Sequence, residues 1–153
     1  MTSPFQSMIK HMIWANERII RRLSECGNAP AGAVRWMSHI LGAEKVWLAR
    51  LHGEDASALP IWPELSLSEC AAAAGDNAAR FERLAERLDE AELQRLAIYR
   101  NSTGTEFRTS VADMLTQVLM HGSYHRGQIN AALRGAGFEP VGVDYIMYAR
   151  ERQ

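Results

Sequence analysis

The sequence predicts an all-α fold, a four-helix bundle of up-down-down-up topology with a long crossover between its second and third helices. Four segments carry apolar residues at helical spacing, and residues typical of helix starts and ends flank them. The connection over residues 52–65 contains Pro60 and Pro63 and is longer than an antiparallel helix pair needs. Extended at up to ~3.3 Å per residue, it can run the ~30 Å length of a ~20-residue helix. The second and third helices can therefore lie parallel.

The first two helices are expected to form an antiparallel pair. Ser3 and Gln6 can form a capping box around the first turn, in which Pro4 suits the first helical position. Gly27 marks the end of this helix. The second helix covers about 31–52 and follows a short Gly-Asn-Ala-Pro turn. The apolar face of the first helix comprises Phe5, Met8, Ile9, Met12, Ile13, Asn16, Ile19, Ile20 and Leu23.

The third and fourth helices follow the crossover. The third begins after Ser66, which can form a second capping box with Glu69. The fourth begins near Ser110 and ends at about 135–137. Between them, residues 96–108 are predicted to form a short extended excursion or a hairpin. The apolar face of the third helix is expected to comprise Leu67, Ala71, Ala74, Ala78, Phe81, Ala85 and Leu88.

The composition indicates one globular domain spanning residues 1–153. Hydrophobic residues make up 47% of the chain, and the formal net charge is −1. Such a charge gives no strong long-range field, so we expect no nucleic-acid partner. No stretch approaches the ~18 apolar residues of a membrane span, so we expect no membrane partner. Cys26 and Cys70 lack a CxxC spacing and the chain starts without a secretory pattern, which together predict a cytoplasmic location.

Two histidines four residues apart, His121 and His125, are the strongest functional signal in the chain. An α-helix places both rings on one side, a turn apart, and the stripe that they share with Ile129 predicts that they face the core. His39 lies near the middle of the second helix, on an apolar face with Trp36. The midpoints of helices of similar length lie at similar depth in a bundle. The three imidazoles can therefore converge.

Three neutral imidazoles with one position left for water are typical of a catalytic divalent-metal site. The alternative is that each histidine is an ordinary hydrogen-bonded core residue. Gly122 stands where the HExxH motif of a zinc protease carries its general-base glutamate, which argues against peptide hydrolysis by that route. The histidines themselves do not identify the metal.

The chain resembles the DinB-like (damage-inducible) family of small bacterial metalloproteins over nearly its whole length. The segments that carry the likeness are FQSMIKHMIWANERII, SHILGAEKVWLARL, HGSYHRGQI and GFEPVGVDYIMYARE. The resemblance implies an up-down-down-up four-helix bundle, usually a homodimer, in which His39, His121 and His125 hold a divalent metal ion. Zinc and nickel are the metals we expect, with iron and manganese as alternatives.

Three polar residues are candidates to support the metal site or to bind substrate. Asn16 and Gln128 offer oxygens that can accept the second N–H of a metal-bound imidazole. Arg126 can bind an anionic group of a substrate or pair with a carboxylate such as that of Asp144. Ordinary inter-helix hydrogen bonds are the alternative for each. The residues that either wall a ligand pocket or pack in the core are Trp14, Trp36, Trp47 and Trp62.

Two classes of function follow from these residues. The first is a metal-dependent enzyme whose open coordination position activates a small nucleophile, and the resemblance suggests a low-molecular-weight thiol and a thiol S-transferase-like reaction. A hydrolase of small esters or amides is its closest variant. The second is a non-catalytic metal-binding protein of a stress response, which stays open because no residue is an unmistakable general base.

Overall fold

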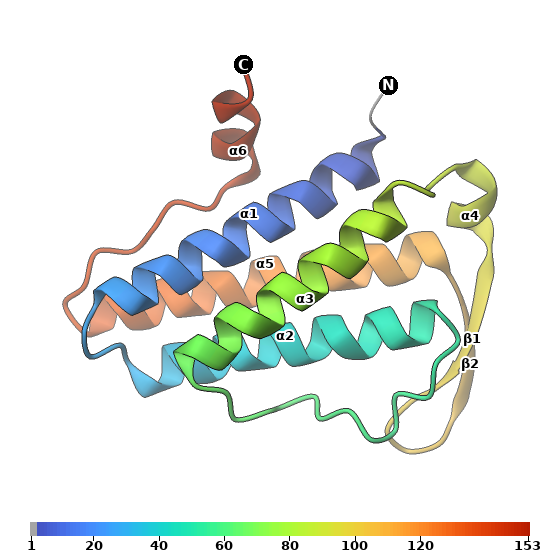
Figure 1. Cartoon of the computed structure of the whole chain (residues 1–153), viewed down its shortest axis with the longest axis horizontal. Helices are drawn as coiled ribbons and strands as arrows, with labels where there is room; N and C mark the ends of the chain where they lie inside the picture. The colour runs from blue at the N-terminus through green and yellow to red at the C-terminus, as the bar shows by residue number, and fades with distance from the viewer. Residues whose placement is uncertain (1–2) are drawn as a thin grey trace.

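The computed structural model describes residues 3–153 and is mostly helical, with a small antiparallel sheet (Figure 1). Four helices are long and two are short. The elements are α1 (Pro4–Glu25), α2 (Ala31–Leu51), α3 (Leu67–Ala85), α4 (Glu90–Gln94), β1 (Leu96–Arg100), β2 (Glu106–Ser110), α5 (Val111–Gly135) and α6 (Tyr145–Glu151).

The capping signals of the sequence set the starts of three long helices. Ser3 and Gln6 form the predicted reciprocal capping box at α1, and Ser66 and Glu69 form the predicted one at α3. Ser110 caps α5 by accepting a hydrogen bond from the backbone N–H of its third residue. The chain leaves α1 through Gly27, whose φ of 67° suits glycine, so the predicted end of this helix is also confirmed.

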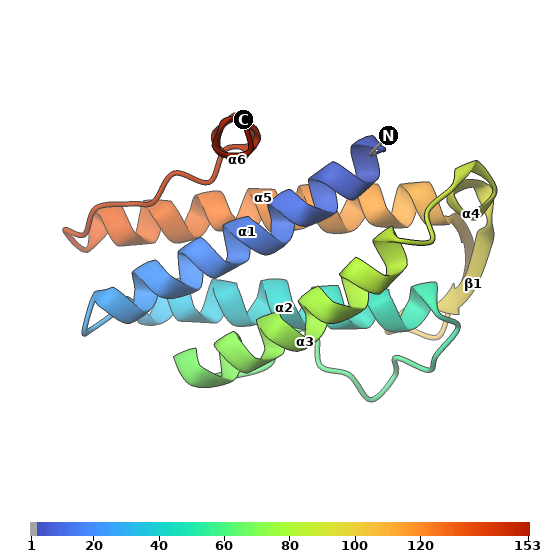
Figure 2. The same ribbon diagram turned by 45° about the horizontal axis from the view of Figure 1, so that its top comes forward.

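The four long helices lie side by side, with α1 and α3 tilted relative to α2 and α5 (Figures 1 and 2). Helix α2 contacts both α3 and α5, and α1 contacts the same two helices from the other side. The segment 52–66 runs back along the length of α2, so α2 and α3 begin at the same end and run in the same direction (Figure 1). This path is the crossover that the length of the connection allowed.

A β-hairpin and two short helices add to the helices that the sequence predicts. Strands β1 and β2 pair antiparallel in the register Leu96↔Ser110 to Arg100↔Glu106, which settles the extended excursion as a hairpin. Ala97 of β1 is buried, whereas Leu96 and Ile98 on its other side are exposed. The hairpin lies across one end of the long helices (Figure 1). Helices α4 and α6, of 5 and 7 residues, are too short for periodicity to predict them.

The core consists of two apolar clusters, one toward each end of the long helices. The predicted core face of α3 is wrong in part, because Ala71 is exposed and Cys70 and Asn77 are buried. Alanine side chains bury little area wherever they lie, so a run of alanines determines the rotation of a helix weakly. In the part of the chain that the structure describes, no helix combines the length and low polarity needed to cross a membrane.

Candidate metal centre

Three histidines from two neighbouring helices meet between α2 and α5. Nε2 of His121 lies 3.0 Å from Nε2 of His39 and 3.1 Å from Nε2 of His125. All three candidate ligand nitrogens lie within 4.8 Å of one another. His39 and His125 are buried, at 5% and 9% exposure. His121 is half-buried, so its ring faces the core less fully than the apolar stripe predicts.

The outer nitrogens of two rings are held by oxygen acceptors. Nδ1 of His39 lies 2.8 Å from the carbonyl oxygen of Ile61, and Nδ1 of His125 lies 2.5 Å from Oε1 of Gln128. An oxygen acceptor at Nδ1 requires the hydrogen on that nitrogen, so each ring directs the lone pair of Nε2 to the centre of the cluster. Gln128 thus lies where the sequence predicts a supporting residue.

The count of protons in this cluster favours a cation. Two of the three inward nitrogens carry lone pairs, and a neutral His121 can place one hydrogen on its Nε2. That hydrogen can point to His39 or to His125, not to both, so at least one close nitrogen pair would bring two lone pairs together. Neutral imidazole nitrogens are preferred ligands of divalent zinc, nickel, iron and copper. The residues therefore fit a divalent metal ion.

Burial keeps the imidazoles of His39 and His121 neutral. Desolvation is the main cause that lowers the pKa of His39, and a smaller contribution comes from the nearby charge of His125. Desolvation, followed by the other two imidazoles, lowers the pKa of His121 to about 4. At neutral pH both rings are therefore unprotonated, as metal ligands must be.

Two tryptophans cover the rings. Trp62 stacks on His39 with ring centroids 3.7 Å apart and an interplanar angle of 10°. Trp36 stacks on His125 at 4.6 Å and 19°. Both indoles therefore wall the cluster, whereas Trp47 lies under Arg50 and Trp14 lies near α6. Large flat side chains in these places hold the imidazoles in one orientation and reduce the access of water.

The crossing segment reaches the cluster because Gly42 leaves room for it. A Cβ at Gly42 would lie 2.6 Å from Cδ of Pro63 and 3.0 Å from the carbonyl oxygen of Pro60. This close approach positions the Ile61 carbonyl and the Trp62 ring against His39. Neither Gly42 nor Ile61 is predicted from the sequence to belong to the site. A glycine inside an apolar helical stretch is the one signal that points to such an approach.

Two of the predicted supporting residues lie in a different place. Nη1 of Arg126 donates to Oδ1 of Asn16 at 2.9 Å, and Nδ2 of Asn16 donates to Glu44 at 2.7 Å. Asn77 donates to the other oxygen of Glu44 at 3.2 Å. These four buried residues form a polar chain with one member from each long helix. In the described residues Asn16 makes no hydrogen bond to an imidazole, and Arg126 donates to Asn16 and does not pair with Asp144, because Asn16 lies between Arg126 and Glu44.

Burial shifts the pKa values of the two ionisable residues in this polar chain. Desolvation raises the pKa of Glu44, and the two asparagine amides oppose that change. Desolvation also lowers the pKa of Arg126 to about 10, which leaves it protonated at neutral pH. The carboxylate and the guanidinium are thus joined through Asn16 without direct contact.

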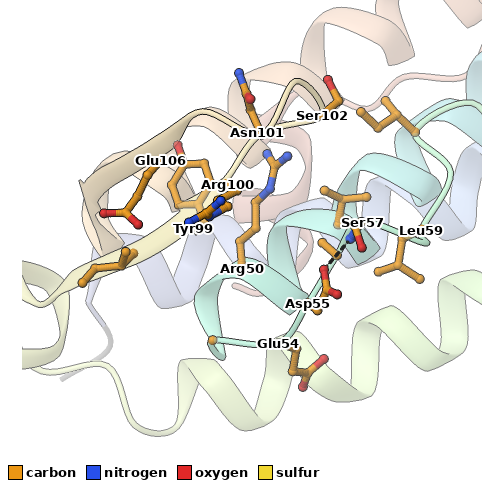
Figure 3. A pocket seen from close by; sticks show the side chains of 16 residues that line it. Arg50, Glu54, Asp55, Ser57, Leu59, Tyr99, Arg100, Asn101, Ser102 and Glu106 are labelled. Carbon is orange, nitrogen blue, oxygen red and sulfur yellow. Dashed lines mark hydrogen bonds between the residues drawn. The ribbon is translucent and has the colours of Figure 1, made fainter.

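A cavity of about 630 Å³ lies between the hairpin and the crossing segment (Figure 3). Arg50 points into it, with its guanidinium 4.8 Å from the Trp47 ring and 4.9 Å from the Tyr99 ring. None of the three clustered histidines lines the cavity, but Ile61 does, and the same residue supports His39. The cavity and the histidine cluster therefore share one segment of wall.

Comparisons with known proteins agree with this architecture. The chain is 27% identical over 156 residues to Protein DinB of Bacillus subtilis (strain 168), covering 92% of this chain and 91% of that protein. Its fold is similar to the crystal structure of a DinB-like protein from Bacillus cereus ATCC 10987, with a TM-score of 0.69 and 20% identity over 92% of this chain and 95% of that one. The sequence profile of the DinB family matches residues 1–153. Because that match runs from end to end, the chain belongs to the DinB family.

Proposed function

We propose that this protein binds one divalent metal ion through His39, His121 and His125 and uses it as a metal-dependent enzyme of thiol S-transferase-like type. The observation that carries the proposal is the convergence of three imidazole nitrogens with too few protons to satisfy one another. Zinc and nickel suit this ligand set, and iron and manganese are alternatives. The proposed scaffold is an up-down-down-up four-helix bundle, supported by the pairwise helix contacts and by the course of the crossing segment.

Three protein ligands leave a position of the metal for a further ligand. When bound, a divalent cation supplies Lewis acidity that lowers the pKa of a thiol at that position and favours the thiolate. The protein's own residues orient the ligands and limit water. Ile61 and Gln128 fix the tautomers of two rings, and the two stacked tryptophans cover them. His121, which is half-buried, marks the side from which a substrate can approach.

The test begins with elemental analysis of protein purified without a histidine tag. We expect about one divalent ion per chain, and loss of that ion in His125→Ala. His52→Ala is the matched control, because His52 caps the end of α2 through the Leu48 carbonyl and lies outside the cluster. Conjugation of a low-molecular-weight thiol to a generic electrophile should follow the metal content. Wild-type protein that binds no ion would refute the metal site.

The second candidate is a non-catalytic metal-binding protein of a stress response. It is supported by the absence of a carboxylate from the three-histidine group in the described residues. Full metal occupancy without turnover of thiols, esters or amides would favour it over the enzyme. Turnover of esters or amides alone would favour a metal-dependent hydrolase. In each case we propose a homodimer in the cytoplasm with a small-molecule ligand and no nucleic-acid or membrane partner.

A further inference from the structure

Arg126 carries a positive charge inside the protein with few partners. The residue is 2% exposed, and within residues 3–153 its side chain makes one hydrogen bond, to Asn16. No ion pair of the described residues includes it. A guanidinium has five N–H donors, and a buried cation without a contacting anion is costly. Donors of Arg126 therefore remain for a partner outside the chain.

A cavity of about 410 Å³ lies against Arg126, between α1, α5 and α6. This volume is in the range of small-molecule sites, roughly 300–1,000 Å³. Its walls are mainly apolar, and Met120 at its edge is 67% exposed. Helix α6 forms one side by packing against α1 (Figure 1). The other lining residues are Pro4, Met8, His11, Leu119, Ser123 and Tyr145.

This cavity is separate from the candidate metal centre. At 100° per residue, positions 119, 123 and 126 share one side of α5, whereas 121 and 125 lie on roughly the opposite side. The guanidinium folds back over Gly122, where a Cβ would lie 2.9 Å from its Nη1. The glycine thus leaves room for the charge between the helix backbone and the cavity.

We infer that this cavity binds a small amphiphilic carboxylate. The carboxylate pairs with Arg126, whose planar fork of donors matches two carboxylate oxygens. The hydrocarbon chain of the ligand lies among Met8, Leu119 and Met120, which offer apolar contact and can adapt to different chains because methionine is flexible. Binding requires neither the metal nor the reaction proposed above.

Titration calorimetry with octanoate tests this inference on the whole protein. We expect octanoate to bind at least about tenfold more tightly than 1-octanol, which has the same chain without the charge. Ser123→Trp should weaken octanoate binding at least about tenfold, because the indole would fill the cavity from an exposed position. Gln117→Trp is the matched control on an exposed part of α5 that does not line the cavity, and it should bind octanoate as the wild type does.

Arg126→Lys supplies a second test that keeps the charge and removes the fork. We expect weaker octanoate binding with unchanged metal content. Equal affinity for octanoate and 1-octanol would overturn the inference, and so would unchanged binding in Ser123→Trp. Sedimentation gives a further refutation. If the wild type is a dimer that does not bind octanoate and Ser123→Trp is a monomer, the cavity is a contact between two copies of the chain and the inference fails.

Discussion

Replacing Gly42 by alanine tests whether the crossing segment holds the metal ligands in place. The new Cβ would lie 2.6 Å from Cδ of Pro63, and a proline ring in a packed segment cannot turn aside as a flexible side chain can. The segment would have to move away from α2. Ile61 and Trp62 would move with it, and His39 would lose its carbonyl acceptor and part of its stacking.

Two opposing effects set the size of the change in the free energy of unfolding. Alanine in place of glycine inside a helix gains about 1 kcal/mol, whereas overpacking of a tight contact costs about 1–3 kcal/mol. Gly75→Ala is the matched control, because Gly75 lies inside α3 and its added Cβ would meet nothing within 4 Å. The control should gain stability, and Gly42→Ala should lie about 1–3 kcal/mol below it. The metal affinity of Gly42→Ala should fall about 10–100-fold.

Urea denaturation of the metal-free proteins measures the change in stability, and competition with a chromogenic chelator measures the change in metal affinity. A domain of this size changes its Tm by about 2–4 °C per kcal/mol, so thermal melts can check the denaturation result. If Gly42→Ala matches the control in stability and the wild type in metal affinity, the contact between Gly42 and Pro63 does not position His39, and the reasoning fails.

Four further predictions address the histidine cluster and the buried polar chain. Gln128→Ala should weaken metal binding about 10–100-fold, because His125 loses its hydrogen-bond acceptor. Gln128→Glu keeps an acceptor and should not weaken metal binding. Equal metal affinities of the two variants in a chelator competition would contradict this. In the metal-free protein the pKa values of His39 and His121 lie below 6.5, so the unfolded chain binds more protons. The free energy of unfolding should therefore fall as the pH drops from about 6.5 toward about 4, and fall less in His121→Gln, as urea titrations at several pH values can show. Glu44→Gln should destabilise the protein by about 1–3 kcal/mol. Asn16 and Asn77 both donate to Glu44 and other hydrogen bonds fix their orientation, so the new amide N–H groups would face a donor. A urea midpoint like that of the wild type would refute this. Metal at about 100 times its Kd should raise the free energy of unfolding by about 2.7 kcal/mol, a gain that a chelator removes and that His39→Ala never shows in thermal melts.

Local sequence determined the four long helices and the starts of three of them. Ser3, Ser66 and Ser110 cap helices through contacts three residues away, so short-range chemistry suffices to find them. The spacing of His121 and His125 placed two rings on one face for the same reason. The partner of His125 was also predictable, because Gln128 lies one turn further along the same helix.

Tertiary structure alone decided which distant groups meet. Asn16 and Arg126 are 110 positions apart, and their hydrogen bond depends on how four helices rotate about their axes. Nothing in the alanine-rich stretch of α3 fixed that rotation strongly, so the burial of Asn77 could not be read from the sequence. The support of His39 by a backbone carbonyl depends on the path of the crossing segment, and a carbonyl leaves no mark on residue type. Contacts within one turn are encoded by spacing, whereas contacts between helices depend on the packing of the whole core.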